Sequence, residues 1–262
     1  MTKSPFRRSS RCDAGAVTGP TRKGRRAVGR TRSVHPARSW PGLIEEHRLL
    51  ASGQHLVGGM DEVGRGAWAG PVVVGVVVVD AATAALPEGV RDSKLLSPSA
   101  RCDLAPTIAS WCASWALGEA TPKEIDRLGM TRALTLAAWR ALRRLEVRPE
   151  TLLLDGPFDF VATGRRRTGE VAPEVTTVVG GDRISGTIAA ASILAKVNRD
   201  GRMDGLARSF PDYGFDQHKG YGTREHEAAI ALRGLTPQHR RSWSFADRLC
   251  PNPTLFEGAH AG

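Results

Sequence analysis

The sequence predicts an α/β protein, in which helices pack on a central β-sheet. Two β-branched runs bracketed by glycine, over residues 56–63 and 71–80, are typical of buried strands. Segments with apolar residues at helical spacing follow, and further short apolar runs lie between them. With 262 residues and 41% hydrophobic content, the chain can bury a core and is too apolar to be disordered throughout.

The remaining elements follow from the same two patterns. Residues 131–145 place Leu134, Ala138 and Leu142 on one side and arginines on the other, which predicts an amphipathic helix. Residues 184–201 are rich in alanine, so a helix there can pack closely on a sheet. We expect helices over 99–113, 131–145 and 184–201, strands over 151–155 and 174–179, and loops over 64–70, 163–169 and 210–222.

Basic residues are concentrated at the N-terminus. Of the 37 Lys and Arg and the 27 Asp and Glu residues, residues 1–40 hold eleven and one, which leaves 26 of each in the remaining chain. The net charge of +10 therefore belongs to this segment, and the rest of the chain is neutral. Because the segment lacks a periodic apolar face, we expect a disordered Arg-rich extension. A solvated extension without a function, a non-specific nucleic-acid-binding arm and a transit peptide remain alternatives.

Composition argues against membrane and disulfide-rich classes of protein. The longest apolar run, residues 72–79, contains Gly75 and ends at Asp80, well short of the roughly 20 residues that cross a bilayer. The N-terminus lacks the apolar stretch of a secretory signal, so we expect a cytoplasmic location. The four cysteines lie far apart without a C-x-x-C pair, which argues against a zinc knuckle or a disulfide scaffold.

Acidic residues follow two of the predicted strands. Asp61 and Glu62 end the first strand, and Asp155 ends the strand at 151–155. If these strands run alike in one sheet, their acids meet at one edge, where like charges are costly unless a cation neutralises them. Carboxylate oxygens without nearby His or Cys suit Mg²⁺ or Mn²⁺ better than zinc. The sequence therefore predicts a divalent metal site, although acids that only cap a turn remain the simpler alternative.

Adjacent side chains of a regular strand point to opposite faces, so Asp61 and Glu62 cannot both point into one site. Either a glycine-assisted bulge redirects one of them, or the second acid contributes its backbone carbonyl. The segment Gly64-Arg65-Gly66 follows at once. Its glycines allow a ligand to approach the backbone and its arginine can pair with phosphate, although an isolated G-R-G is more often an ordinary turn.

Seven short motifs lie between about residue 43 and residue 249. They are Met60-Asp-Glu-Val-Gly-Arg-Gly66, Asp92-Ser-Lys-Leu95, Leu154-Asp-Gly156, Gly181-Asp182, Ala190-Ala-Ser-Ile-Leu-Ala-Lys196, His218-Lys-Gly-Tyr221 and His239-Arg-Arg-Ser-Trp243. Their order and spacing resemble the type 2 ribonucleases H, specifically the bacterial ribonuclease HII group. Residues 1–40 lie outside the resemblance.

The resemblance implies an RNase H-like fold, a mixed five-stranded sheet flanked by helices, as a catalytic domain over 41–250 with a flexible tail at 251–262. It also implies an endoribonuclease that cuts the RNA strand of RNA/DNA hybrids and incises at single ribonucleotides embedded in duplex DNA. The implied products carry a 3′-hydroxyl and a 5′-phosphate, and the implied mechanism is two-metal-ion hydrolysis with Mg²⁺ or Mn²⁺. We expect a monomer.

Matched by position, the resemblance assigns the catalytic acids to Asp61, Glu62, Asp155 and Asp182, of which the first three are also the expected metal ligands. Asp200 is a rival for the fourth position, but its i,i+4 spacing from Lys196 fits an ion pair on a helix surface better.

The resemblance further implies a nucleic-acid contact set. Peptide groups of Gly64, Arg65 and Gly66 would touch the 2′-hydroxyl, which distinguishes RNA from DNA at a single position. The ring of Tyr221 would stack on the adjacent deoxyribose. Lys219 is a candidate phosphate neighbour, although a solvated lysine is equally compatible with the sequence.

Two functions from other classes remain. A non-catalytic RNA/DNA-binding protein would use the basic extension and a degenerate site, and the complete set of four acids argues against it. A metal phosphatase on a similar fold would leave the G-R-G segment and Tyr221 without a role.

Overall fold

The structure is a computed structural model that describes residues 40–162 and 171–250. The predicted extension at 1–40, except for its last residue, lies outside these ranges. The predicted loop at 163–169 and the predicted tail at 251–262 lie outside them as well.

Within the described residues, five strands form one mixed sheet in the order β3-β2-β1-β4-β5. β1 pairs antiparallel with β2 and parallel with β4, while β2 and β3 are antiparallel and β4 and β5 are parallel. This topology confirms the predicted mixed five-stranded sheet. The strands are β1 (Val57–Val63), β2 (Val72–Val79), β3 (Ser114–Ala120), β4 (Thr151–Asp155) and β5 (Glu174–Val178).

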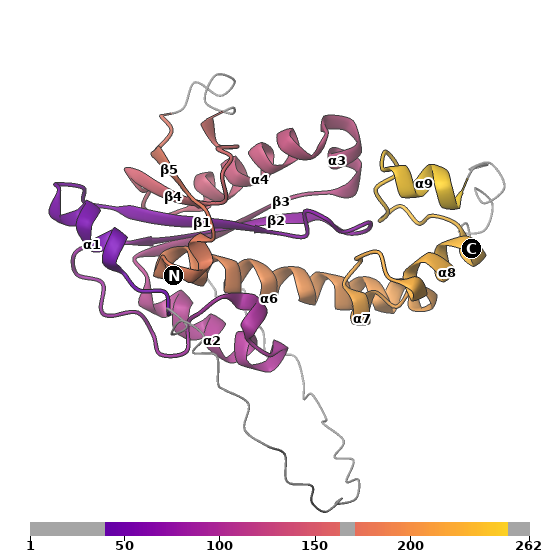
Figure 1. Cartoon of the computed structure of the whole chain (residues 1–262), viewed down its shortest axis with the longest axis horizontal. Helices are drawn as coiled ribbons and strands as arrows, with labels where there is room; N and C mark the ends of the chain where they lie inside the picture. Colours follow the sequence, from indigo (N-terminus) through magenta and orange to yellow (C-terminus); the bar gives the residue numbers. More distant parts are fainter. Residues whose placement is uncertain (1–39, 163–170, 251–262) are drawn as a thin grey trace, which may run out of the picture. The chain divides into compact units, whose positions relative to one another are not determined.

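Helices flank the sheet and continue beyond it towards the C-terminus (Figure 1). Between them, residues 40–162 and 171–250 contain three single turns of 3₁₀ helix, η1 (Ser93–Leu95), η2 (Gly181–Arg183) and η3 (Pro211–Tyr213). The α-helices are α1 (Ile44–Ala51), α2 (Pro98–Trp111), α3 (Pro122–Leu128), α4 (Met130–Arg144), α6 (Gly186–Ser209), α7 (Phe215–His218), α8 (Arg224–Arg233) and α9 (Ser244–Leu249).

The sheet lies between two helical layers. α4 packs on β3 and β2 on one face, and α6 packs on β1 and β2 on the other (Figure 1). Met60 and Leu154 belong to the hydrophobic cluster on the α4 face, whereas Val57 and Leu153 pack with Ile188 of α6. Successive residues of β1 and β4 therefore alternate between the two faces, as regular strands require.

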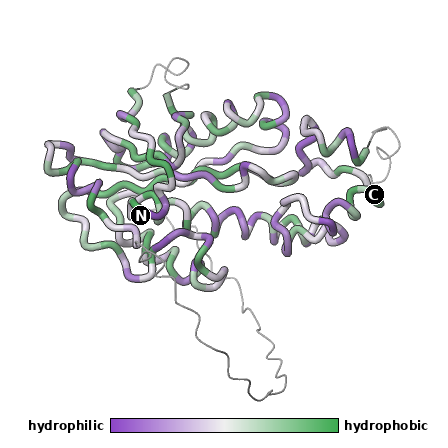
Figure 2. Tube along the Cα trace, in the orientation of Figure 1, coloured by the Kyte–Doolittle hydropathy of each residue, from purple (hydrophilic) through white to green (hydrophobic). Residues whose placement is uncertain are grey.

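Close packing of α6 on the sheet depends on two strand glycines. A Cβ atom at Gly59 would collide with Thr187, and one at Gly75 would lie 2.5 Å from the carbonyl oxygen of Ala191. The predicted packing of a small-residue helix on the sheet is confirmed. The helix is longer than predicted, since α6 continues from the expected end at residue 201 to Ser209. The sequence prediction ended too early because the later turns of α6 are hydrophilic and interrupt the apolar pattern of the earlier turns (Figure 2).

Several elements were not predicted. β3 has the sequence Ser-Trp-Ala-Leu-Gly-Glu-Ala, which contains no β-branched residue, although its burial alternates along the strand. The predicted loop at 210–222 contains η3 and the short helix α7, and α1, α3, α8 and α9 were also missed. No helix of the described part of the chain is long and apolar enough to cross a bilayer.

The unpredicted helix α1 supports the start of α6. Its Glu46 is fully buried, and its Oε1 atom accepts hydrogen bonds from Ser185 Oγ at 2.6 Å, Thr187 N at 2.9 Å and Thr187 Oγ1 at 2.7 Å. The carboxylate thus caps backbone and hydroxyl donors at the N-terminus of α6, where a negative charge is also favoured by the helix dipole.

We expect Glu46→Ala to lower the free energy of unfolding by about 2–3 kcal/mol, because it leaves buried donors without an acceptor. Urea unfolding followed by circular dichroism measures this loss. Glu45→Ala is the matched control, since the Glu45 carboxylate makes only an exposed pair with Arg48. Equal losses in the two variants would show that the cap does not matter.

Candidate active site

The parallel register of β1 and β4 brings two acids together. The ladder pairs Val57 with Thr151 and continues to Met60 with Leu154, so Asp61 and Asp155 are the next residues on the two strands. Because Met60 and Leu154 face α4, both aspartates face α6. Asp61 is 7% exposed and accepts a hydrogen bond from Ser192 of α6.

Glu62 is on the opposite face of β1. The antiparallel ladder with β2 runs without interruption from Val57 to Val63, so no bulge redirects Glu62 within this pairing. Its carboxylate lies 3.4 Å from Arg65 Nη1 and is close enough to Asp155 for their charges to interact. The sequence left two alternatives for Glu62, a bulge that redirects its side chain or a contribution through its backbone carbonyl. The regular pairing with β2 excludes a bulge on that side.

Asp182 reaches the same edge from the turn that precedes α6. It lies in η2 and is 4% exposed. The preceding Gly181 donates its backbone N–H to Asp155 Oδ1 at 2.6 Å, which ties this turn to the end of β4. Lys94 Nζ, from η1, lies 3.1 Å from Asp182 Oδ2 and is the nearest ammonium group to this carboxylate among the described residues.

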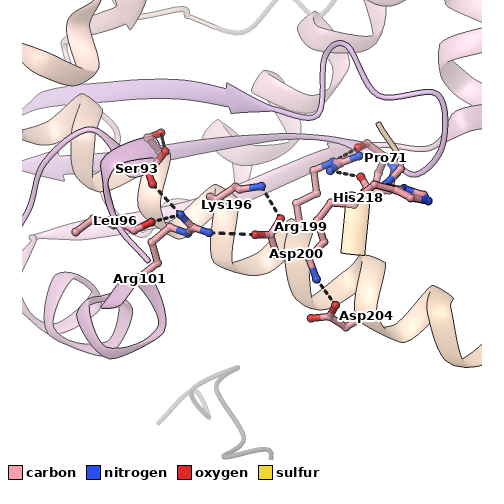
Figure 3. A network of polar contacts seen from close by, with 12 residues as sticks. Pro71, Ser93, Leu96, Arg101, Lys196, Arg199, Asp200, Asp204 and His218 are labelled. Carbon is pink, nitrogen blue, oxygen red and sulfur yellow. Dashed lines mark hydrogen bonds and ion pairs between the residues drawn. The ribbon is translucent and has the colours of Figure 1, made fainter. Parts of the chain in front are cut away.

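The rival acid Asp200 lies elsewhere on α6. Lys196 Nζ binds Asp200 Oδ1 at 2.7 Å, the i,i+4 ion pair expected from the sequence, and Arg101 Nη2 lies 3.5 Å from Asp200 Oδ2 (Figure 3). Arg101 also donates to the backbone carbonyls of Ser93 and Leu96 on either side of Lys94. Asp200 thus supports the turn that carries Lys94 and is not one of the converging acids.

Asp61, Glu62 and Asp182 have raised pKa values. Burial raises the pKa of Asp61 from 3.8 to about 7, opposed by the Ser192 hydrogen bond and assisted by the charges of Glu62 and Asp155. Burial also raises the pKa of Glu62 and of Asp182, although Arg65 and Lys94 respectively oppose these shifts. For Lys94, burial lowers the pKa, but the hydrogen bond and charge of Asp182 outweigh it and leave a raised value.

This donor set fits a hard divalent cation. The donors are carboxylate oxygens, they repel one another, and Asp61 and Asp155 form no ion pair within the described ranges. No three acidic, His or Cys side chains of residues 40–162 and 171–250 are already grouped as metal ligands. The ammonium of Lys94, whose charge also acts on Asp61, partly neutralises the edge instead.

The G-R-G segment follows β1, and hydrogen bonds from a buried arginine hold its backbone in place. Gly64 has a φ of +85°, a conformation that favours glycine. Arg240 is fully buried and donates to the carbonyl oxygens of Gly64 at 2.6 Å, Arg65 at 2.8 Å and Gly70 at 3.1 Å. The Arg65 side chain remains largely exposed. Gly66 has open space around its Cα, so a ligand can approach the backbone there.

Tyr221 and Lys219 lie on the turn beside this loop. In this loop, the backbone N–H groups of Trp68 and Ala69 donate hydrogen bonds to Gly220 O, at 2.8 Å and 3.1 Å respectively. Tyr221 is 37% exposed, and the guanidinium of Arg199 lies 5.4 Å from its ring centroid. The ammonium of Lys219 pairs with Asp204 of α6 instead of lying free in solvent (Figure 3).

Comparison with known proteins decides the family. A family model described as Ribonuclease HII matches residues 58–246. The chain belongs to the ribonuclease HII family. It is therefore an enzyme of the nuclease class, and its matched region includes all four acids, the G-R-G segment and Tyr221.

Relatives are similar in sequence to this chain over most of its length. Ribonuclease HII of Streptomyces avermitilis is 45% identical over 206 residues, which cover 79% of this chain and 84% of the relative. Ribonuclease HII of Thermus thermophilus is 46% identical over 195 residues, 72% of this chain and 86% of the relative. Among solved structures, ribonuclease H2 of Pyrococcus horikoshii has a TM-score of 0.62 at 27% identity and covers 78% of this chain and 99% of its own.

Sequence reasoning missed two buried arginines beside the candidate site. Arg199 and Arg240 are both fully buried, and their described hydrogen bonds go to backbone carbonyls, including those of Pro71 and Gly64. An arginine is normally expected at the surface, and no local pattern marks these two as buried. The available signals were the position of Arg240 within the motif His239-Arg-Arg-Ser-Trp243 and that of Arg199 three residues after the motif that ends at Lys196.

The raised pKa of Asp61 gives a pH dependence of stability in protein without bound metal. A carboxyl whose folded pKa is raised stabilises the fold below its unfolded pKa of 3.8 and loses this contribution as the pH rises towards about 7. We expect the free energy of unfolding to fall over this window, by at most about 1.4 kcal/mol per pH unit from this group. Denaturant unfolding in EDTA at several pH values measures the slope.

Asp61→Asn should flatten that slope, because the amide does not titrate. Asp80→Asn is the control, since Asp80 follows β2 at the opposite edge of the sheet, where its carboxylate binds Ala82 N and Thr83 Oγ1. An unchanged slope in Asp61→Asn would contradict the assigned burial of this acid.

Proposed function

We propose that this chain is a divalent-metal-dependent endonuclease that cuts the RNA strand of RNA/DNA hybrids. We further propose that it incises at single ribonucleotides embedded in duplex DNA and leaves a 3′-hydroxyl and a 5′-phosphate. Membership of the ribonuclease HII family supports the first activity directly. The proposal includes a monomeric enzyme located in the cytoplasm.

One observation supports the proposal most strongly: carboxylates outnumber their cationic partners next to the G-R-G segment, whose backbone a ligand can approach. Asp61 and Asp155 lie side by side at one edge of the sheet, and neither forms an ion pair within the described residues. The G-R-G segment begins two residues after Glu62. A phosphodiester held against this segment would therefore lie next to the acids.

Asp61, Glu62 and Asp155 would hold the metal, which we propose to be Mg²⁺ or Mn²⁺, and Asp182 would complete the acidic set. When bound, a pair of ions supplies an activated water and stabilises the leaving 3′-oxygen, the chemistry of two-metal hydrolysis. The raised pKa of Asp61 implies that this carboxyl gives up a proton when a cation arrives.

The remaining residues would select and orient the nucleic acid. Peptide groups of Gly64, Arg65 and Gly66 would contact the 2′-hydroxyl, and the exposed Arg65 side chain can pair with a phosphate. The Tyr221 ring would stack on the adjacent deoxyribose. Lys219 was a candidate phosphate contact, but its ion pair with Asp204 gives the ammonium another partner.

We expect Asp155→Asn to reduce cleavage of a hybrid duplex by at least about a thousand-fold, since a carboxylate that would hold the metal is lost. Folding and duplex binding should be retained. The measurements are gel-based cleavage with Mg²⁺ or Mn²⁺, circular dichroism and duplex binding by fluorescence anisotropy.

Asp80→Asn controls for the loss of a strand-end aspartate at the opposite sheet edge and should retain wild-type turnover. EDTA should stop the wild-type reaction, and the ends of the product should map to a 3′-hydroxyl and a 5′-phosphate. Near-normal turnover of Asp155→Asn with Mg²⁺ would defeat the proposal.

A further inference from the structure

Lys219 adopts a backbone conformation that normally belongs to glycine. With a φ of +51°, it is the one non-glycine residue with a positive φ in the described part of the chain. Its Cβ makes this left-handed conformation costly, so surrounding contacts must hold it in place. The turn formed by residues 218–221, which we call the tyrosine turn, contains this strained residue immediately before Gly220 and Tyr221.

Helix α6 holds Lys219 at two points. Arg199 Nη1 donates to Lys219 O at 2.9 Å, and the Asp204 carboxylate binds Lys219 Nζ (Figure 3). Arg199 and Asp204 both belong to α6, so this one helix anchors both the main chain and the side chain of Lys219. Lys219 N also donates to Phe215 O at 3.1 Å.

The tyrosine turn is joined to the loop that carries the G-R-G segment. Gly220 O accepts the two backbone hydrogen bonds from Trp68 and Ala69, and a Cβ atom at Gly220 would collide with Ala69 O. Arg199 Nη2 donates to the same Ala69 carbonyl at 3.1 Å and stacks near the ring of Tyr221. A shift of the tyrosine turn would therefore displace Tyr221 relative to the loop.

We propose that Asp204 is a positioning residue for substrate selection: by binding the Lys219 ammonium, it keeps the tyrosine turn in its left-handed conformation and Tyr221 in register with the G-R-G segment. This inference rests on the proposed function of Tyr221. The Lys219 side chain is 20% exposed and that of Asp204 is 47% exposed, so the pair lies at the surface and affects the turn more than global stability.

This role has the opposite consequence from a role of Lys219 as a phosphate contact. If Asp204 only neutralises a phosphate-binding lysine, its removal frees a positive charge and tightens duplex binding, with a steeper salt dependence. If Asp204 positions the turn, its removal loosens Tyr221 and weakens selection without adding affinity. The sign of the change distinguishes the two roles.

The first test uses free protein and does not depend on activity. Native-state amide hydrogen exchange should become about five-fold faster at Gly220 and Tyr221 in Asp204→Asn, as expected for loss of one partly exposed ion pair. Asp204→Glu should restore most of the protection. The matched control is Glu119→Gln, which removes another carboxylate partner of α6, the one bound to Arg202 Nη2 at 2.6 Å, and should leave the turn unchanged.

The second test measures selection. In Asp204→Asn, kcat/KM for a duplex with one ribonucleotide should fall about five-fold relative to kcat/KM for an RNA/DNA hybrid, while Asp204→Glu and Glu119→Gln keep the wild-type ratio. Unchanged exchange at the turn, or tighter duplex binding with a steeper salt slope, would overturn the role of Asp204. Failure of the wild type to incise the ribonucleotide duplex would instead reject the proposed function, and the exchange experiment would still decide whether Asp204 holds the turn.

Discussion

The parallel register between β1 and β4 is the constraint on which the site depends. It places Asp61 and Asp155 beside each other on the face covered by α6. The same face must also admit α6 closely, which Gly59 and Gly75 permit because neither has a side chain. A larger residue at either position would push the helix away and with it Ser192, the hydrogen-bond partner of Asp61.

Burial of like charges at this edge has an energetic cost that the fold offsets only in part. Asp182 has Lys94, and Glu62 has Arg65, but Asp61 has only the Ser192 hydroxyl and the backbone N–H of Glu62 as described partners, and its pKa is about 7. The positive charges that are fully buried, on Arg199 and Arg240, are directed instead at backbone carbonyls of the neighbouring loop and turn. The structure therefore separates an acidic edge from a neighbouring loop that is held by buried cations.

Much of this arrangement could be predicted from the sequence. The valine-rich and leucine-rich runs predict the bounds of β1, β2 and β4 to within about two residues, because short β-branched and apolar runs favour buried strands. The strand-end position of Asp61 and Asp155 already implied a shared edge. The matched motifs added Asp182, and the i,i+4 spacing from Lys196 argued against its rival Asp200. The structure brings the turn of Asp182 to Asp155, while Asp200 pairs with Lys196.

Other features depend on contacts between distant segments and could not be predicted. The capping of α6 by Glu46 joins residues about 140 positions apart, and a buried glutamate in a short helix looks like a surface residue in the sequence. Likewise, the sequence around Lys219 is compatible with a phosphate-binding lysine. Only its left-handed backbone and its contact with Asp204 indicate a different role.

The most direct test of the acidic edge is calorimetric titration of Mg²⁺ or Mn²⁺ near pH 6.5 in buffers of different ionisation enthalpy, which counts the protons released on binding. We expect proton release by the wild type, because Asp61 is partly protonated at this pH, and we expect neither tight binding nor release in Asp61→Asn. Binding of the same strength in both proteins, without proton release, would contradict the account of Asp61 as a buried carboxyl that needs a cation to ionise.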